Sequence, residues 1–164
     1  MGRHPKPIST PHLRRGLLAA ALRTLQAEAG LTFDSMATGP SVSVSSAALK
    51  RAASGEKVPK AKTVKDFAAA CGADLLMTDH LLKLRTQARI EERGVLAKLR
   101  APKVEMIADR ADLGVALVQV YEAAGAPTPR EIQDASGNPH ALPLSTIRRC
   151  QRSLKADPRR VSEN

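Results

Sequence analysis

Aromatic residues are nearly absent from this chain of 164 residues. It has no Trp, one Tyr and two Phe, 2% in all, although 43% of its residues are apolar. A hydrophobic core must therefore be built from Ala, Leu, Val and Ile, and Ala and Leu are strong helix formers. The alternating stretch at residues 41–44 is too short to found a sheet. We expect an all-α fold, in one domain or two small ones.

Cysteines, metal-binding spacings and catalytic motifs are also scarce. Cys71 and Cys150 are the only cysteines; they stand in helix-like segments and are predicted to be small buried residues, not a disulfide framework. None of the four histidines lies three or four residues from another His or Cys, so we expect no metal site. No glycine loop ends in Gly-Lys-Ser/Thr, and Asp109 and Asp112 are predicted to be ordinary helix surface charges. We therefore expect no cofactor, no small-molecule ligand and no enzymatic activity.

Long apolar runs are missing too. The longest fall far short of a membrane span, and the first residues carry Arg3, His4 and Lys6 without the apolar run of a secretory signal. We expect a cytoplasmic protein, associated with the nucleoid and not with a membrane. Prolines at three of the first eleven positions predict a disordered basic arm over residues 1–11.

Acidic residues are too few to balance the basic ones. The chain has 26 Lys/Arg and 16 Asp/Glu, a formal charge of +10. Residues 1–65 hold 11 of the cations and three of the acids, and a second group of cations follows Arg148. A polyanion is the natural partner, because each neutralised phosphate releases condensed counterions.

Hydrophobic periodicity predicts several short helices and then a long one. Apolar residues form a stripe over residues 12–29, which Gly30 ends. Thr32 is expected to cap a second helix and Ser45 a third, at residues 46–54, with Gly55 as its stop. A fourth helix is expected at residues 63–71 and a long one at residues 74–100. The residues expected to face inward are Leu13, Leu17, Leu18, Ala21, Leu22, Leu25, Phe33, Met36, Ala37, Val64, Phe67, Ala68, Cys71, Leu75, Leu81, Leu82, Leu84, Ala88, Val95, Leu96 and Leu99.

The third of these helices has the sidedness of a DNA-reading helix. At 100° per residue, Leu49, Ala52 and Ala53 share the inward side. The outward side holds Ala47, Lys50, Arg51 and Ser54, and such a slender polar face can enter the major groove, which is about 12 Å wide. Small side chains at Ser46 and Ala47 allow close approach to base edges, and Lys57, Lys60 and Lys62 follow within reach of the phosphate backbone.

A looser copy of this pattern recurs from Gly125 to Pro158. An amphipathic helix is expected over residues 108–124, with Leu113, Ala116, Leu117, Val120, Tyr121 and Ala124 inward. A second one is capped by Thr128, with Pro129 at its first position and Ile132 and Ala135 inward. A third is anchored by Ile147, with Cys150 inward and Ser145, Arg148, Arg149 and Arg152 outward. We interpret the pair as a duplicated supersecondary unit.

Residues 13–75 resemble the lambda-repressor-like, or Xre-type, helix-turn-helix family. The matching series runs from Leu25 and Gly30-Leu31-Thr32 through Met36-Ala37, Val44-Ser45, Leu49, Arg51-Ala52, Ser54-Gly55 and Val58-Pro59 to Phe67-Ala68-Ala69-Ala70-Cys71-Gly72. The Ala-rich, Arg-rich style looks like the regulators common in high-GC actinobacteria. The resemblance implies a five-helix DNA-binding domain that often acts as a homodimer. It also implies base reading by Ser46, Ala47, Lys50 and Arg51, and a phosphate contact at Thr32 and Phe33.

The chain departs from the family pattern at two places. The turn between Ala37 and Val44 is longer than usual, and Phe33 stands where a polar residue is usual. The second copy lacks a fourth and a fifth helix and is therefore a partial unit. The predicted organisation is an arm at 1–11, a helix-turn-helix domain at 12–75, a long connecting helix at 76–104, a second helix-turn-helix-like unit at 105–158 and a tail at 159–164.

The function predicted from these features is sequence-specific binding of double-stranded DNA, in transcriptional regulation, with helix 46–54 in the major groove. The basic helix at Arg148–Arg152 would add a second contact or a backbone clamp. Two alternatives stay open: a helical protein-interaction module that uses the face from Leu81 to Leu99, and a non-specific chromosome-coating DNA binder. The candidate DNA-binding residues are Thr32, Phe33, Ser45, Ser46, Ala47, Lys50, Arg51, Ser54, Lys57, Lys60, Arg148, Arg149 and Arg152.

Overall fold

The computed structural model describes residues 7–8, 10–94, 103–138, 140 and 142–155, with the backbone alone at 153–155. Within these ranges the regular structure is helical and there is no strand, so the all-α prediction is confirmed. The chain divides into two compact units, residues 1–92 and 93–164. The expectations for residues 1–6, for the long helix at 95–100 and for the tail at 159–164 lie outside the described residues.

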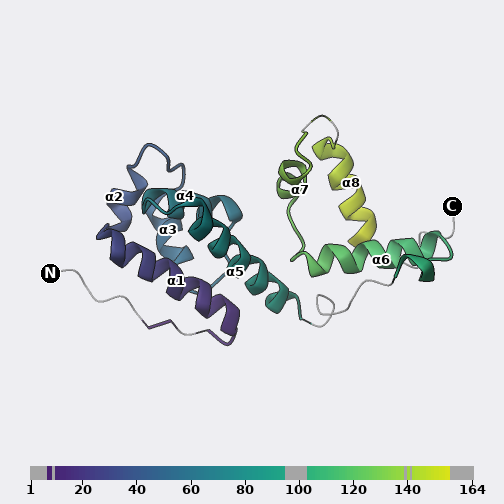
Figure 1. Cartoon of the computed structure of the whole chain (residues 1–164), viewed down its shortest axis with the longest axis horizontal. Helices are drawn as coiled ribbons and strands as arrows, with labels where there is room; N and C mark the ends of the chain where they lie inside the picture. Colours follow the sequence, from purple (N-terminus) through teal and green to yellow (C-terminus); the bar gives the residue numbers. More distant parts are fainter. Residues whose placement is uncertain (1–6, 9, 95–102, 139, 141, 156–164) are drawn as a thin grey trace. The chain divides into compact units, whose positions relative to one another are not determined.

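The first unit is a five-helix domain (Figure 1). Its elements are α1 (Leu13–Ala29), α2 (Phe33–Ala37), α3 (Ser46–Ala52), α4 (Ala61–Ala70) and α5 (Leu75–Arg93). Gly30 ends α1 in a left-handed conformation and Thr32 caps α2, both as predicted. The predicted boundary at residue 75 is too early, because the unit extends through α5.

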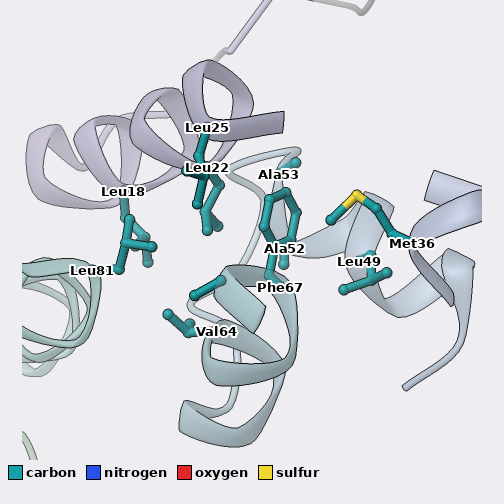
Figure 2. Packing of buried hydrophobic residues seen from close by; sticks show 11 residues of the cluster. Leu18, Leu22, Leu25, Met36, Leu49, Ala52, Ala53, Val64, Phe67 and Leu81 are labelled. Carbon is teal, nitrogen blue, oxygen red and sulfur yellow. The ribbon is translucent and has the colours of Figure 1, made fainter. Parts of the chain in front are cut away.

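One cluster of buried side chains holds the five helices together. Leu18, Leu22 and Leu25 of α1 face Phe67 and Val64 of α4 (Figure 2). The other helices contribute Met36 from α2, Leu49 and Ala52 from α3, and Leu81 from α5. The core consists mainly of Leu, Ala and Val around one Phe, in keeping with the composition expected from the shortage of aromatic residues.

Three leucines expected in this core lie at the surface instead. Leu13 and Leu17 are exposed because α1 buries the side that carries Leu18, Leu22 and Leu25, and Leu17 stands about 100° around the helix from Leu18. Leu75 is 88% exposed at the first position of α5. Cys71, at the C-terminal end of α4, is half-buried and packs against the cluster.

The long helix predicted from residue 74 to residue 100 is confirmed over most of its described part, but it ends earlier than predicted. α5 ends at Arg93, and Gly94 follows with φ +73°, a left-handed conformation that costs glycine little and stops a helix. Leu81, Leu82 and Leu84 pack into or against the core of the first unit. α5 is therefore the fifth helix of the domain, and Leu81, Leu82 and Leu84 are engaged in its core and not free to form the proposed protein-interaction face.

The end of the predicted arm folds onto the first unit. Thr10 accepts hydrogen bonds from Nε and Nη2 of Arg15, at 2.9 and 2.7 Å. Ile8 is half-buried, and its Cγ2 lies 3.1 Å from the position that a Cβ on Gly55 would occupy. The expectation of disorder is thus wrong for Ile8 and Thr10, which are held by side-chain contacts.

The second unit contains a short 3₁₀ helix, η2 (Val104–Met106), followed by α6 (Arg110–Ala123), α7 (Pro129–Ala135) and α8 (Leu144–Lys155). The predicted cap is confirmed: Thr128 caps α7 and Pro129 occupies the first position. The Glu131 side chain also accepts a hydrogen bond from the backbone N–H of Thr128, which completes a capping box. Several residues predicted to face inward are exposed, because the three helices of this unit do not cover the whole apolar side of one another. They are Leu113, Leu117 and Val120 of α6, Ala124 directly after it, Ala135 of α7 and Cys150 of α8.

Candidate nucleic-acid interface

Helix α3 has one buried and one exposed side. The Oγ of Ser45 accepts a hydrogen bond from the backbone N–H of Ala48 and so begins the helix, as predicted. Leu49 is fully buried at 0% exposure, and Ala52 is buried beside it. Lys50 and Arg51 are exposed. The helix is therefore anchored on its apolar side and presents both cations to solvent.

The two small residues at the start of α3 differ in exposure. Ala47 is exposed and Ser46 is half-buried. The Nε of Arg51 donates to the carbonyl of Ala47 across one helical turn, at 3.3 Å. The outward face of α3 thus consists of Ala47 and the two cations, with Ser46 at its edge.

Ser54 lies beyond α3, contrary to the predicted end of the helix. α3 ends at Ala52, and the Ser54 hydroxyl donates to the carbonyl of Arg51 at 2.9 Å while accepting from the N–H of Glu56 at 3.2 Å. Both bonds belong to the turn that closes the helix. Ser54 is therefore part of the α3 stop and not of the exposed helical face.

The long turn between α2 and α3 is held to the domain by three consecutive residues, Val42, Ser43 and Val44. Val42 and Val44 are half-buried against the core. Between them, Ser43 donates to Oδ2 of Asp66 from its backbone N–H, at 2.9 Å, and from its hydroxyl, at 2.8 Å. The turn is thus held by two apolar side chains and by the hydrogen bonds of the serine between them.

Asp66 is a buried carboxylate on α4, at 7% exposure. Burial by itself would raise its pKa, but the hydrogen bonds from Ser43 and the charge of Lys62 together lower the pKa below its ordinary value. Lys62 lies one turn before Asp66 on α4, with its Nζ 3.5 Å from Oδ2, and also donates to the Ser43 hydroxyl. Asp66 therefore stays ionised and accepts from the turn that leads into α3.

Two arginines hold the other end of the α3 region. The Nε of Arg23, in α1, donates to the carbonyl of Ala53 at 2.7 Å. The Nε of Arg85, a buried residue of α5, donates to the carbonyl of Pro59 at 2.8 Å. A carbonyl at the end of α3 and one in the loop before α4 thus accept hydrogen bonds from neighbouring helices.

A dense set of cations surrounds α3. Residues 46–65 contain six Lys/Arg and one acid, Glu56. Lys57 and Lys60, predicted to grip the phosphate backbone, are both exposed, and so is Lys65. The segment from α3 into α4 is therefore the part of the first unit where exposed positive charge is concentrated.

At the start of α2, Thr32 and Phe33 have different roles. The Thr32 hydroxyl caps the helix by accepting from the N–H of Ser35, at 3.1 Å. The Phe33 ring packs edge-on against Phe67, with 6.4 Å between ring centroids. A phosphate contact at Phe33 would have to come from its backbone, because its side chain serves the core.

The predicted second basic helix is α8, which belongs to the second unit. Ile147 anchors it at 5% exposure, as expected. Gln151, not Cys150, takes the next place on the covered side: it is half-buried and its Nε2 donates to the carbonyl of Pro127 at 2.9 Å. The exposed residues of α8 include Ser145, Arg148, Arg149 and Arg152.

Sequence reasoning missed the polar residues that hold the α3 region in place. Arg85 could have been found, since it lies four residues after Leu81 and three before Ala88, within an apolar stripe where a charge needs a partner. Asp66 gave only a weak signal, an acid one turn after Lys62. Arg23 gave none, because its partner is a backbone carbonyl 30 positions away.

The sequence comparison agrees with this geometry. The family model described as a helix-turn-helix domain matches residues 17–81. These residues form a helix-turn-helix domain. The match takes in all of α2, α3 and α4 and reaches Leu81 in α5. No curated protein and no solved structure matches the chain.

A helix-turn-helix domain suggests DNA as the binding partner. The described ranges contain neither of two further features, a metal-ion cluster and a membrane-spanning helix. No cluster of three or more His, Cys, Asp or Glu side chains there is arranged to hold a metal ion. No helix among the same residues is both long and apolar enough to span a bilayer.

Proposed function

We propose that this chain binds double-stranded DNA sequence-specifically and regulates transcription, with α3 of the helix-turn-helix domain in the major groove. The observation that carries the proposal is the orientation of α3. Leu49 is buried beneath the helix while Lys50 and Arg51 are exposed on its outer side. A slender helix with an anchored back and a cationic front fits a groove about 12 Å wide.

Each position on the outer side of α3 supports a particular kind of contact. Arg51 can donate two hydrogen bonds to O6 and N7 of one guanine, the commonest specific contact in the major groove. Lys50 is a less selective donor. The methyl group of Ala47 and the small Ser46 allow the helix backbone to approach base edges closely.

The lysines around α3 support the backbone part of the interface. Lys57 and Lys60 lie exposed on the segment that follows α3, where they can pair with phosphates that flank the groove. Phosphate contacts fix the register of a protein on the duplex without reading sequence. In this proposal they supply affinity, and Arg51 supplies selectivity.

The second unit adds a further basic helix. Arg148, Arg149 and Arg152 are exposed on α8, and Ile147 anchors it, which supports a second DNA contact or a backbone clamp. The resemblance to dimeric regulators supports a homodimer on DNA. Light scattering of the full chain with and without its DNA site measures that stoichiometry.

Selection of bound fragments from a random duplex pool tests the function directly. We expect enrichment of one short motif, which footprinting then locates under α3. Retention of the pool without enrichment would instead favour a non-specific coating protein. Failure to retain DNA, together with a stable complex with another protein, would favour an interaction module.

A further inference from the structure

Ser43 ties the turn before α3 to the body of the domain. Its backbone N–H and its hydroxyl both donate to Oδ2 of Asp66, at 2.9 and 2.8 Å. Ser43 stands two residues before Ser45, the N-cap of α3. A buried carboxylate is costly unless its hydrogen-bond donors are well placed. Asp66 therefore favours the one position of Ser43 in which both bonds form.

A second contact holds the other end of α3. Arg23 of α1 holds the carbonyl of Ala53, the residue that closes the helix. Leu49 is buried between the two ends. A short rod held at both ends cannot tilt about its middle, whereas one released at its N-terminal end can turn about Leu49.

We propose that Asp66 is a positioning residue, which sets the angle of α3 through Ser43 and thereby makes base reading selective without touching DNA. This inference rests on the proposed DNA-binding function. Base contacts need α3 at one angle, because each bidentate pair has a fixed geometry. Phosphate contacts by flexible lysines tolerate a tilt.

The position of Asp66 gives this role a distinctive signature. Replacement by Asn removes a negative charge beneath a basic surface, and simple electrostatics therefore raises affinity for every DNA sequence. It also puts a neutral amide in place of the ionised acceptor of both Ser43 bonds, and neutral hydrogen bonds are weaker than charge-assisted ones. Loss of positioning lowers affinity for the specific site alone. A loss of folded protein lowers both affinities by the same factor.

The experiment measures the affinity of the full chain for the site selected by the wild-type protein and for a scrambled duplex, at one salt concentration. We expect Asp66→Asn to bind the selected site about tenfold more weakly, the size of losing one good base contact. Affinity for the scrambled duplex is expected to stay constant or to rise less than about threefold. Circular dichroism verifies that the variant is folded at the assay temperature.

Two further variants complete the design. Glu56→Gln removes the same charge from an exposed position near α3, and we expect it to leave the ratio of the two affinities unchanged. Ser43→Ala removes the hydroxyl bond but keeps the backbone N–H bond to Asp66. It is expected to lower specific affinity about threefold, a fraction of one base contact, and it carries the test if Asp66→Asn does not fold.

The outcomes separate this inference from the function beneath it. A preferred site for the wild type, with an unchanged affinity ratio in Asp66→Asn and Ser43→Ala, overturns the positioning role alone. Equal losses on both duplexes also overturn it, because they indicate a purely structural role. A wild-type chain without any preferred site overturns both proposals.

Discussion

At the scale of single residues, the helix-turn-helix domain places polar side chains where they hold backbone and charged ones where they can meet a partner. Asp66 and Arg85 are buried, and both hydrogen-bond to backbone groups of the segments that flank α3. Arg51 is exposed on the helix that those segments carry. The buried charged residues therefore hold the backbone in place, and the exposed ones are the candidates for contact with a partner.

Arg51→Ala is expected to weaken binding to the selected DNA site by about 1–3 kcal/mol, because a guanine would lose its bidentate donor. Titration of labelled duplex measures the change. Arg110→Ala is the matched control: Arg110 is also exposed but lies on α6 in the second unit, and we expect it to leave specific affinity nearly unchanged. Equal losses in the two variants would show that α3 is not the reader.

The two cysteines should differ in reactivity. Burial raises the pKa of Cys71, so less of its thiol is ionised at neutral pH, whereas Cys150 is exposed on α8. A thiol-reactive disulfide reagent at pH 7 is expected to modify Cys150 quickly and Cys71 slowly. Cys150→Ser should remove the fast phase, and denaturant should make the two rates similar. A fast phase that survives in Cys150→Ser would contradict the prediction.

At the scale of elements, α3 depends on the glycine that follows its stop. Gly55 has φ +78°, and a Cβ there would lie 3.1 Å from the Cγ2 of Ile8 and 3.3 Å from the Cβ of Ala19. The left-handed turn, the folded end of the arm and α1 thus meet at one residue. The arm is held against the domain at the point where α3 ends.

Gly55→Ala should therefore destabilise the domain more than Gly30→Ala does. Gly30 has φ +64° but no atom within 4 Å of its missing Cβ, so its replacement adds only conformational strain of about 1–2 kcal/mol. Gly55→Ala also requires Ile8 or Ala19 to move by a few tenths of an ångström, which we expect to cost about 1 kcal/mol more. Urea unfolding of the two variants measures the difference in the free energy of unfolding. Equal destabilisation would mean that Ile8 does not pack against Gly55 in solution.

At the scale of the whole molecule, positive charge is the dominant feature. The chain carries a formal charge of +10, and six of its cations lie in residues 46–65. The second unit presents three further arginines on α8. Such a surface favours any polyanion, so selectivity must come from the geometry of α3 and not from charge alone.

DNA binding should fall steeply with salt, because phosphate contacts release counterions. We expect affinity to drop by at least about tenfold between roughly 50 and 200 mM salt. Replacing Lys57 and Lys60 with Ala should reduce the slope of log affinity against log salt by about one for each phosphate that is no longer neutralised. Affinity that is flat across this range would remove the electrostatic basis of the proposed function.

The sequence by itself determined the local features of the first unit. The caps at Thr32 and Ser45, the stop at Gly30 and the two sides of α3 could all be predicted. Each depends on residues within about one helical turn, where spacing and side-chain chemistry act directly. Which side of the proposed reading helix faces outward follows from Leu49, Lys50 and Arg51 for the same reason.

Only the tertiary structure decided what lies against these elements. It showed that α5 closes the domain, and that Asp66, Arg23 and Arg85 hold segments 23, 30 and 26 residues away in sequence. It also left Leu113 and Leu117 of α6 exposed, although their spacing predicts a buried face. Periodicity shows that a helix has an apolar side, but whether that side is covered depends on which other elements pack against it.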